Sequence, residues 1–362
     1  MNKIIFFIAS LCNGGAERVV SVLSGQMLSY FETVEILTFY ERPLFYDVDS
    51  RVKIKSIEGD THTKNVLKNC IYLRKYLDFA KPTVFVSFMA PFNILALLSI
   101  RNNRSYPIIV ADRSDPRYEC RNWLRSFLRD ILYLNKADEV VIQSLKNIKY
   151  YPDKVQSKIS VIFNPSSLPE KCFGIALRTP KEKYFVQVAR LDAVKNQKML
   201  IRSFCNVHAK HGDYKLIIYG DGPLRSELQE MIEELDIQDN VLLPGRIKNV
   251  ADTIKNAEAF VLSSHYEGMS NSLLEAMGIG LPVISTEVSG AVDLITNQHN
   301  GIIVPCDDEQ KMAEAMLSVI ENKEQSVLMA NNAIDVNILL DLKTITSKWL
   351  NLFEGAISKY KK

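Results

Sequence analysis

The sequence predicts an α/β protein of two domains, each built on a parallel β-sheet. At 362 residues the chain is too long for one ordinary hydrophobic core. Short apolar runs alternate with helical segments from one end of the chain to the other. Most of these runs lack strict polar alternation, which is typical of strands covered by helices on both faces. Together these observations indicate sheets of the Rossmann type.

The candidate strands fall into two sets. The first set is Ile4–Ile8, Val34–Phe39, Val84–Phe88, Ile108–Ala111 and Glu139–Gln143. The second set is Tyr184–Val188, Lys215–Tyr219, Val241–Leu243, Ala259–Leu262, Pro282–Ser285 and Gly301–Val304. Helical segments lie between them, for example Ala16–Ser29, Asn196–Lys210 and Leu224–Leu235. Both halves of the chain should therefore share one architecture.

The domain boundary is expected between the two sets. Residues 164–180 read NPSSLPEKCFGIALRTP, which is rich in Pro and Ser and has no clear periodicity, as in a linker. We therefore expect a first domain at residues 1–165, a second at 166–342, and a cleft between them. Residues 343–362 contain an amphipathic helix, which we expect to pack back on the first domain.

Two apolar stretches resemble membrane segments. The opening MNKIIFFIASLC is short and leads into GGAER rather than a cleavage site, which favours a buried first strand over a signal peptide. Residues 83–100 carry no charge, but Pro91 and Asn93 interrupt them. A strand, a turn and a helix explain this segment better than one membrane-spanning helix.

The charge balance and the cysteines exclude other classes of protein. There are 44 Lys and Arg against 42 Asp and Glu, a net charge of +2, which gives no general attraction to nucleic acid. The 6 cysteines are scattered, without a C-x-x-C pair, which indicates free thiols in a reducing, cytoplasmic compartment. His208 and His211 have no apparent third ligand, so we expect no metal site.

A first candidate site is the sequence NGGAER, residues 13–18. Gly14 and Gly15 let the backbone approach a ligand closely, and the helix that follows points its free N–H groups into the same space. The pattern is neither G-x-G-x-x-G nor a Walker A loop. It predicts either an anion site or a plain turn from strand to helix.

A second candidate site is a pair of cations after the first strand of the second set. Arg190 follows that strand, and Lys195 lies at the entry to a helix. Two cations at the carboxyl end of a strand can bind a diphosphate, and Arg can do so with two hydrogen bonds. The alternative is a solvated pair beside Asp192.

The strongest candidate site runs from Glu267 to Glu275. Glu267 lies in a loop after the strand at residues 259–262, and Gly268–Asn271 enter a helix whose N-terminal amides can hold phosphate or hydroxyl oxygens. Glu275 lies about one turn further on. Carboxylates suit sugar hydroxyls because each accepts several hydrogen bonds, and ribose is often held by such an acid. The alternative is that Glu267 caps the helix and Glu275 is solvated.

Basic side chains recur in the first half at helical spacing. Lys64, Lys68 and Lys75 share one helical face. Arg117, Arg121, Arg125 and Arg129 share another, with Trp123, Phe127 and Ile131 on a different side of the same segment. The default interpretation is a solvated helix surface. The alternative is contact with an anionic membrane or a lipid diphosphate.

An ordered set of motifs resembles a known family. They are GGAER, Asn164-Pro165, VARLDAVKNQ, YGDGPLRSEL, LPGRIKNV, EGMSNSLLEAM, GLPVIST and NGIIVP. The chain resembles glycosyltransferase family 4, whose members are retaining enzymes with the GT-B fold, in which two Rossmann-like domains face a cleft. GGAER and ADRSDP are similar to bacterial members that build cell-surface glycans on a lipid carrier. EGMSNSLLE resembles the family's E-x7-E signature.

The resemblance implies a role for each matching residue in the second domain. Arg190 and Lys195 would hold the donor diphosphate and stabilise the leaving group, without a metal or other cofactor. Glu275 would bind the ribose, and Glu267 would contact the donor sugar without acting as a nucleophile. The backbone of the loop between them would hold the sugar hydroxyls, through Gly268, Met269, Ser270 and Asn271.

The resemblance also implies roles for positions outside this loop. Gly15 matches a glycine close to the donor phosphates, and Gly245 and Arg246 lie where the family's loop meets the base. Many relatives carry a His in the first domain, where this sequence has Arg113. Arg113 would then take over a contact with a phosphate or with the acceptor.

The resulting hypothesis is a retaining transferase that uses a nucleotide-sugar donor. We expect a UDP-sugar carrying an N-acetylhexosamine or a hexose, with UDP-N-acetylgalactosamine as the leading candidate. The acceptor would be a polyprenyl-diphosphate-linked glycan in the assembly of a bacterial capsule or lipopolysaccharide, with the enzyme bound peripherally to the inner face of the cell membrane. The alternatives are a sugar-nucleotide epimerase of the same fold and a non-catalytic binding module.

Overall fold

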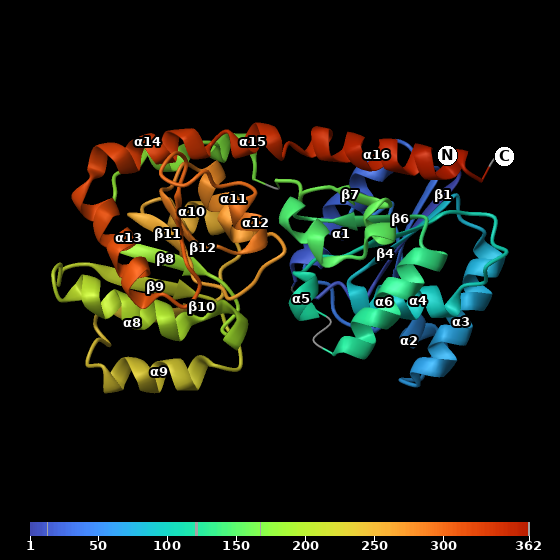
Figure 1. Cartoon of the computed structure of the whole chain (residues 1–362), viewed down its shortest axis with the longest axis horizontal. Helices are drawn as coiled ribbons and strands as arrows, with labels where there is room; N and C mark the ends of the chain where they lie inside the picture. Colours follow the sequence, from blue (N-terminus) through green and yellow to red (C-terminus); the bar gives the residue numbers. More distant parts are fainter. Residues whose placement is uncertain (13, 120–121, 167, 361–362) are drawn as a thin grey trace. The chain divides into compact units, whose positions relative to one another are not determined.

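The chain forms two compact α/β units. The computed structural model describes residues 1–12, 14–119, 122–166 and 168–360 (Figure 1). One unit consists of Met1–Pro165 together with Leu342–Lys362, and the other of Ser166–Asp341. Each unit contains one sheet in which every strand pair is parallel, which confirms the predicted fold class.

The first unit holds a seven-stranded sheet in the order β3-β2-β1-β4-β5-β6-β7. Its strands are β1 (Lys3–Ile8), β2 (Thr33–Thr38), β3 (Lys53–Ser56), β4 (Val84–Phe88), β5 (Ile108–Ala111), β6 (Glu139–Ile142) and β7 (Ile159–Val161). The segment that resembles a signal peptide is an inner strand, β1, in which Ile4 is the register partner of both Val34 and Val84. The prediction of a buried first strand is therefore confirmed.

Helices cover both faces of this sheet. They are α1 (Gly15–Met27), α2 (Ile57–Thr61), α3 (Val66–Ala80), α4 (Ala90–Ser99), α5 (Pro116–Glu119), α6 (Trp123–Lys136), α7 (Asp153–Gln156) and α16 (Leu342–Ser358), with a 3-10 turn η1 (Leu145–Tyr150). Right-handed crossovers place α3, α4 and α6 on one face and α1 on the other. Within the first group α4 contacts both α3 and α6. These three helices therefore form one layer.

The uncharged stretch at residues 83–100 is divided as predicted. It forms β4 and α4, with Met89 at a φ of 75° between them. Every residue of β4 is buried. Within the described part of the chain, no helix is long and apolar enough to cross a membrane.

The last helix, α16, completes the core of the first unit. Trp349 is fully buried, and its ring centroid lies 6.1 Å from that of Phe88. Phe353, one turn later, lies 6.2 Å from Phe31. The Arg113 guanidinium lies 4.8 Å from the Phe88 ring centroid and 5.5 Å from that of Trp349, so a cation from the loop after β5 is packed between the two rings.

The second unit holds a six-stranded sheet in the order β10-β9-β8-β11-β12-β13. Its strands are β8 (Tyr184–Val188), β9 (Lys215–Tyr219), β10 (Val241–Gly245), β11 (Ala259–Leu262), β12 (Val283–Thr286) and β13 (Ile302–Val304). The α-helices are α8 (Gln197–His208), α9 (Arg225–Glu234), α10 (Val250–Ile254), α11 (Asn271–Gly278), α12 (Ser289–Val292), α13 (Glu309–Glu321), α14 (Lys323–Ala333) and α15 (Val336–Leu339). The 3-10 turns are η2 (Glu170–Cys172), η3 (Ile175–Arg178) and η4 (Ala193–Lys195).

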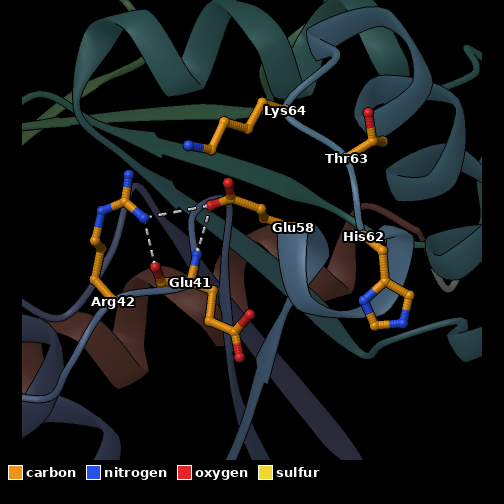
Figure 2. Close-up of a pocket in the computed structure, with 6 residues that line it drawn as sticks. All are labelled: Glu41, Arg42, Glu58, His62, Thr63 and Lys64. Atoms are coloured by element: carbon orange, nitrogen blue, oxygen red, sulfur yellow. Dashed lines mark hydrogen bonds and ion pairs between the residues drawn. The ribbon is translucent and has the colours of Figure 1, made fainter.

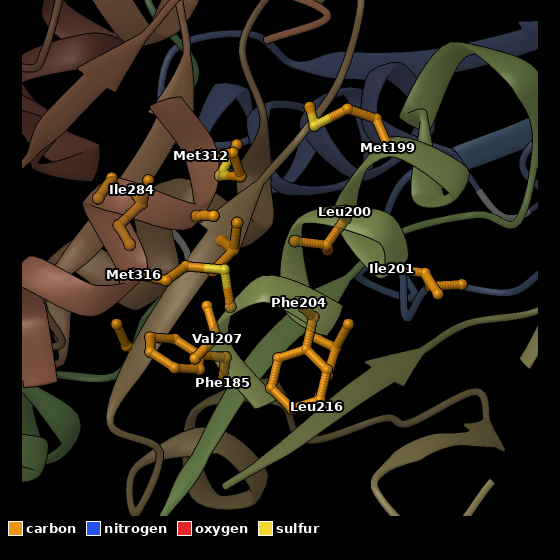
Figure 3. Close-up of a cluster of buried hydrophobic side chains, with 14 of the residues drawn as sticks. Phe185, Met199, Leu200, Ile201, Phe204, Val207, Leu216, Ile284, Met312 and Met316 are labelled. Carbon is orange, nitrogen blue, oxygen red and sulfur yellow. The ribbon is translucent and has the colours of Figure 1, made fainter. Parts of the chain in front are cut away.

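The core of this unit lies between the sheet and the helices α8 and α13. Phe204 on α8 and Met316 on α13 point into a buried cluster that also contains Phe185 of β8 (Figure 3). The two helices contact each other directly. This apolar core holds the strands in place, and the candidate site residues extend from the carboxyl ends of those strands.

The segment predicted to be a linker is instead packed on the second unit. Leu168, Cys172 and Ala176 are buried. The backbone N–H of Gly174 donates to the Gly278 carbonyl at 3.1 Å, and that of Ala176 donates to the Ile279 carbonyl at 2.8 Å. Periodicity could not reveal this because η2 and η3 are single turns.

Replacing Trp349 by Ala should destabilise the first unit by about 3–5 kcal/mol, because it removes a fully buried ring and leaves a cavity beside Phe88. Urea unfolding followed by far-ultraviolet circular dichroism measures the change. Lys348→Ala, at the exposed neighbouring position of α16, is the control and should shift stability by less than about 0.5 kcal/mol. Equal effects of the two substitutions would contradict a core role for Trp349.

Candidate active site

The candidate site lies where the strand order of the second sheet reverses. From β8 the chain proceeds to β9 and β10 on one side, whereas β11 lies on the other side of β8 and leads to β12 and β13. Ligands of open α/β sheets bind at such a switch point, outside the carboxyl ends of the strands. The loops that follow β8 and β11 carry Arg190, Lys195 and Glu267.

Asp192 organises the loop that follows β8. Its Oδ1 accepts hydrogen bonds from the backbone N–H groups of Val194 at 3.1 Å and Lys195 at 3.2 Å. Its other oxygen pairs with the Arg190 guanidinium. The Arg190 side chain is nevertheless 70% exposed, so its remaining N–H groups are accessible to a ligand. Gln197 fixes the backbone by donating to the Arg190 carbonyl at 2.9 Å.

Lys195 meets Glu267 across the switch point. The Lys195 ammonium forms an ion pair with Glu267 Oε1, and both side chains are largely buried. Ser264 donates a hydrogen bond of 3.0 Å to the same carboxylate oxygen. The two loops are joined by backbone as well, since the His265 N–H donates to the Val194 carbonyl at 2.8 Å. A cation and a carboxylate predicted from separate motifs therefore form one cluster.

Glu267 does not cap the helix that follows it. The N-cap of α11 is Ser270, whose Oγ accepts from the Leu273 N–H at 3.4 Å. The structure thus excludes the capping alternative for Glu267. Glu275, in the middle of α11, is only 6% exposed, which excludes the solvated alternative for that residue as well.

The loop from Gly268 to Asn271 is held closely against α12. A Cβ added to Gly290 would lie 2.2 Å from the Gly268 carbonyl oxygen, so only glycine fits at the start of α12. Met269 is buried and Ser270 is occupied in the cap. This packing fixes the backbone path between the two glutamates.

The turn after β9 presses on the Arg190 loop in the same way. A Cβ on Gly222 would lie 2.3 Å from the Leu191 carbonyl oxygen. Gly245 ends β10 with a φ of +97°, a conformation that favours glycine, and its carbonyl accepts from the Gly220 N–H at 2.8 Å. Arg246 follows it and is exposed. Gly245 and Arg246 thus lie at the carboxyl end of β10, which is two strands from β8 in the sheet.

Several residues that hold this cluster were not predicted from the sequence. Ser263 donates to the Lys195 carbonyl at 2.7 Å, and Thr286 donates to the Ser264 carbonyl at 2.7 Å. Asp307, after β13, accepts from Asn196 at 2.8 Å and lies 3.1 Å from His265 Nδ1. All of these residues except Asn196 lie at or just after the carboxyl end of a strand. That position in the sequence is the signal that could have predicted them.

Gly15 belongs to the first unit, at the start of α1. This helix is the first element after β1, and Gly14, which precedes it, is extended. A Cβ on Gly14 would lie 2.1 Å from the Glu17 carboxylate, so a larger residue there would require the flexible Glu17 side chain to move. Burial raises the pKa of the Glu17 carboxyl above its usual value of 4.5. Asn13 of the same motif lies outside the described residues.

A polar hollow of about 370 Å³ opens beyond β2 and β3 of the first unit (Figure 2). Glu58 contacts two other residues that line the hollow. Its carboxylate accepts a hydrogen bond from the Glu41 N–H at 3.0 Å and lies 3.6 Å from Arg42. His62 and Lys64 complete the lining, together with Thr63. Lys64 was predicted as an acceptor or membrane contact. It lines this hollow from the loop before α3.

Arg113 is partly exposed, but much of its guanidinium is shielded from solvent. Its Nε and Nη2 atoms are shielded from solvent, and its Nη1 donates to Asn164 at 3.3 Å. Burial lowers the pKa of the guanidinium to about 9. Arg113 was predicted to contact a phosphate or the acceptor. In the structure its guanidinium instead packs between the Phe88 and Trp349 rings.

The predicted arginine stripe is not present as a single face. Arg117 belongs to α5, whereas Arg125 and Arg129 belong to α6. Arg125 is exposed, but Arg129 is buried and pairs with Asp130 at 2.8 Å. Arg121 lies outside the described residues. The prediction of one arginine face was wrong. Helical spacing shows which residues share a face, but it does not show which face is buried by contacts with the rest of the unit.

Of the three lysines predicted to share one helical face, two lie on α3, whereas Lys64 lies in the loop before it. Lys68 and Lys75 are both exposed and lie seven residues apart along the helix, so they share one side of it. Among the residues that the structure describes, no group of three or more His, Cys, Asp or Glu side chains could hold a metal ion.

Comparison with known proteins points to one family. Residues 171–336 match the family described as glycosyl transferases group 1. The chain is 30% identical over 361 residues to a Campylobacter jejuni protein, with 97% of this chain and 98% of the relative covered. That protein is named GalNAc-alpha-(1->4)-GalNAc-alpha-(1->3)-diNAcBac-PP-undecaprenol alpha-1,4-N-acetyl-D-galactosaminyltransferase.

A second relative and a solved structure agree. The chain is 29% identical over 357 residues to a C. jejuni N-acetylgalactosamine-N,N'-diacetylbacillosaminyl-diphospho-undecaprenol 4-alpha-N-acetylgalactosaminyltransferase, covering 92% of the chain and 94% of the relative. The structure of S. aureus TarM G117R with fondaparinux, alpha-GlcNAc-glycerol and UDP superposes with a TM-score of 0.78 at 16% identity, covering 98% of this chain and 100% of TarM. Such likeness confirms the expected GT-B fold of two Rossmann-like domains.

Replacing Glu17 by Gln should stabilise the first unit at neutral pH, since it removes a charge from a partly buried, partly desolvated position. Because burial raises the folded pKa of Glu17 above 4.5, the native state binds this proton more tightly than the unfolded state does. Wild-type stability should fall as the pH rises through the folded pKa. The advantage of the variant should therefore grow from acidic to neutral pH in thermal unfolding. A constant or shrinking difference would contradict the assignment.

Proposed function

Because this chain belongs to the glycosyl transferases group 1 and is a glycosyltransferase, we propose that it moves an N-acetylhexosamine or a hexose from a UDP-sugar. The acceptor is a polyprenyl-diphosphate-linked glycan, and the anomeric configuration is retained, as in family 4. The observation that carries the proposal is the cluster of Arg190, Lys195 and Glu267 at the switch point of the second sheet.

The two cations suit a diphosphate that must leave. Arg190 offers several N–H donors in one plane, and Lys195 adds a second positive charge. When the bond between the sugar and the diphosphate breaks, negative charge grows on the phosphate oxygen. Fixed cations stabilise that charge without a metal ion, because they are already oriented before the reaction begins.

Glu267 and Glu275 have separate roles in this proposal. Glu275, inside α11, accepts hydrogen bonds from the ribose hydroxyls. Glu267 contacts the donor sugar together with the backbone from Gly268 to Asn271. Its carboxylate is held by Lys195 and Ser264, which supports a role as a hydrogen-bond acceptor. Arg246 lies at the same sheet edge and is assigned to the uridine side.

Retention follows from attack on the face from which the diphosphate leaves. The acceptor hydroxyl oxygen forms a bond to the anomeric carbon as the bond from that carbon to the phosphate oxygen breaks. The acceptor proton passes to the departing phosphate, whose negative charge makes it a suitable base. The two cations offset part of that charge, which stabilises the bond breaking.

The choice of substrates is supported by relatives. The two C. jejuni proteins are named as N-acetylgalactosaminyltransferases with undecaprenol-linked substrates, and the TarM structure contains UDP. UDP-N-acetylgalactosamine is therefore our first donor. None of the three proteins is described as an epimerase. A lipid-linked acceptor also places the enzyme at the cytoplasmic membrane surface, toward which exposed Lys64, Lys68, Lys75 and Arg125 contribute positive charge.

Replacing Arg190 or Lys195 by Ala should lower kcat by about 10²- to 10³-fold, because each removes a preoriented charge from the leaving group. Transfer from radiolabelled UDP-N-acetylgalactosamine to lipid extract is the measurement, repeated with other UDP-sugars and with a chelator. Lys198→Ala is the matched control, since Lys198 lies on α8 and pairs with Glu227. No transfer from any UDP-sugar by the intact protein would refute the proposal.

The two glutamates can be separated by binding and turnover. Glu275→Gln should weaken UDP binding about tenfold, because a neutral amide accepts fewer hydrogen bonds from ribose. Glu267→Gln should leave the UDP affinity nearly unchanged and lower kcat with the sugar donor. Calorimetry with UDP and initial rates with the UDP-sugar measure the two effects. The assignments would be reversed if Glu267→Gln alone weakened UDP binding.

A further inference from the structure

The outward face of α6 is apolar, although the helix lies on the surface of the first unit. Five large side chains recur along it at helical spacing and all point to solvent. Their exposed fractions are 73% for Trp123, 53% for Leu124, 59% for Phe127, 37% for Leu128 and 40% for Ile131. These five residues are called the α6 stripe. A continuous apolar surface of this kind on a soluble unit indicates a binding surface.

The helix cannot rotate to bury this stripe, because its inner face is held by a polar network. Tyr133 donates to Asp112 Oδ1 at 2.5 Å, and Tyr151 donates to Asp112 Oδ2 at 2.6 Å. Arg129 is buried beside them, with its guanidinium 4.6 Å from the Tyr151 ring centroid. Turning α6 would expose these paired groups only by breaking their hydrogen bonds. The outward position of the stripe is therefore built into the fold.

The same helical layer continues the surface. On α3, Leu67 is 71% exposed and Ile71 is 47% exposed, and Leu98 of the intervening α4 is 47% exposed. Lys68 and Lys75 lie on α3 and are exposed. Apolar and cationic side chains thus occur together on the outer side of the layer formed by α3, α4 and α6.

The charges of these helices favour an anionic partner. The acidic residue of α3, Asp78, lies 3.3 Å from Arg101, and that of α6, Asp130, lies 2.8 Å from Arg129. Arg125 is exposed beside the α6 stripe. Positive charge next to a row of aromatic and aliphatic side chains is the combination that binds helices to bilayers with anionic headgroups.

We propose that the α6 stripe inserts into the boundary between headgroups and acyl chains of an anionic bilayer. Arg125, Lys68 and Lys75 contact headgroup phosphates, and Trp123 lies at the interface, where indole rings are favoured. This assignment rests on the proposed function, because a lipid-linked acceptor is presented at such a surface. It replaces the predicted arginine stripe with an apolar one as the membrane contact.

Trp123 supplies a direct optical test. The chain has 2 tryptophans, and the other, Trp349, is fully buried. Adding vesicles of equal parts phosphatidylcholine and phosphatidylglycerol should shift the Trp123 emission to shorter wavelength, and brominated acyl chains should quench it. Trp349 gives a constant background. An unchanged emission spectrum at saturating lipid would overturn the proposal.

Substitutions identify the inserting side chains. Phe127→Glu and Leu124→Glu should each lower partitioning into these vesicles about tenfold or more, because apolar burial is replaced by a charge repelled by the headgroups. Both positions are exposed, so the fold should be retained, as circular dichroism checks. Ile338→Glu on α15, where the side chain is 76% exposed, is the matched control in the other unit and should leave partitioning unchanged. Equal losses in all three would reject the stripe.

The remaining outcomes separate this proposal from the transferase chemistry. Vesicle binding is measured without donor or acceptor, so it stands even if no sugar is transferred. Phe127→Glu should keep full activity on a water-soluble short-chain acceptor and lose it on acceptor in vesicles. A wild-type protein that ignores vesicles but forms a dimer disrupted by Phe127→Glu would assign the stripe to a second copy of the chain, and would overturn the docking.

Discussion

The reversal of strand order between β8 and β11 is the constraint on which the candidate active site depends. The strands run parallel, so their loops leave from one edge, and the connections from β8 and β11 lead away in opposite directions. This geometry brings together Lys195 and Glu267, which are 72 residues apart. Asp192, Ser263 and Ser264 then hold each loop, so the charged side chains are positioned before any ligand arrives.

The central strands could be predicted because burial on both faces requires an apolar run. The two strands that the sequence did not reveal, β3 and β7, are the edges of the first sheet. β3 reads KIKS and is mostly exposed, whereas β7 has three residues, all half-buried. An edge strand has one neighbour and a weaker demand for apolar side chains, so its pattern resembles that of a loop.

For the candidate site, position after a strand predicted Arg190, Lys195 and Glu267, but not which of them would pair. Pairing depends on the order of strands, which local pattern does not contain. Helix α6 shows the same limit. Its spacing defined two faces, yet Asp112 and Tyr151, which lie outside the helix, decide that Arg129 is buried and that Phe127 is exposed.

The packing of α16 in the first unit has a consequence for the order of folding during synthesis. The buried side chains of α16, Trp349 and Phe353 among them, complete a core whose other elements precede Pro165, so that core is incomplete while the ribosome makes the intervening 166–341. The second unit is continuous in sequence and can fold as soon as it emerges. The first unit, whose strands are synthesised first, can therefore complete its core only after the second unit has been made. Until then Phe88 and Arg113 lack the Trp349 ring that covers them.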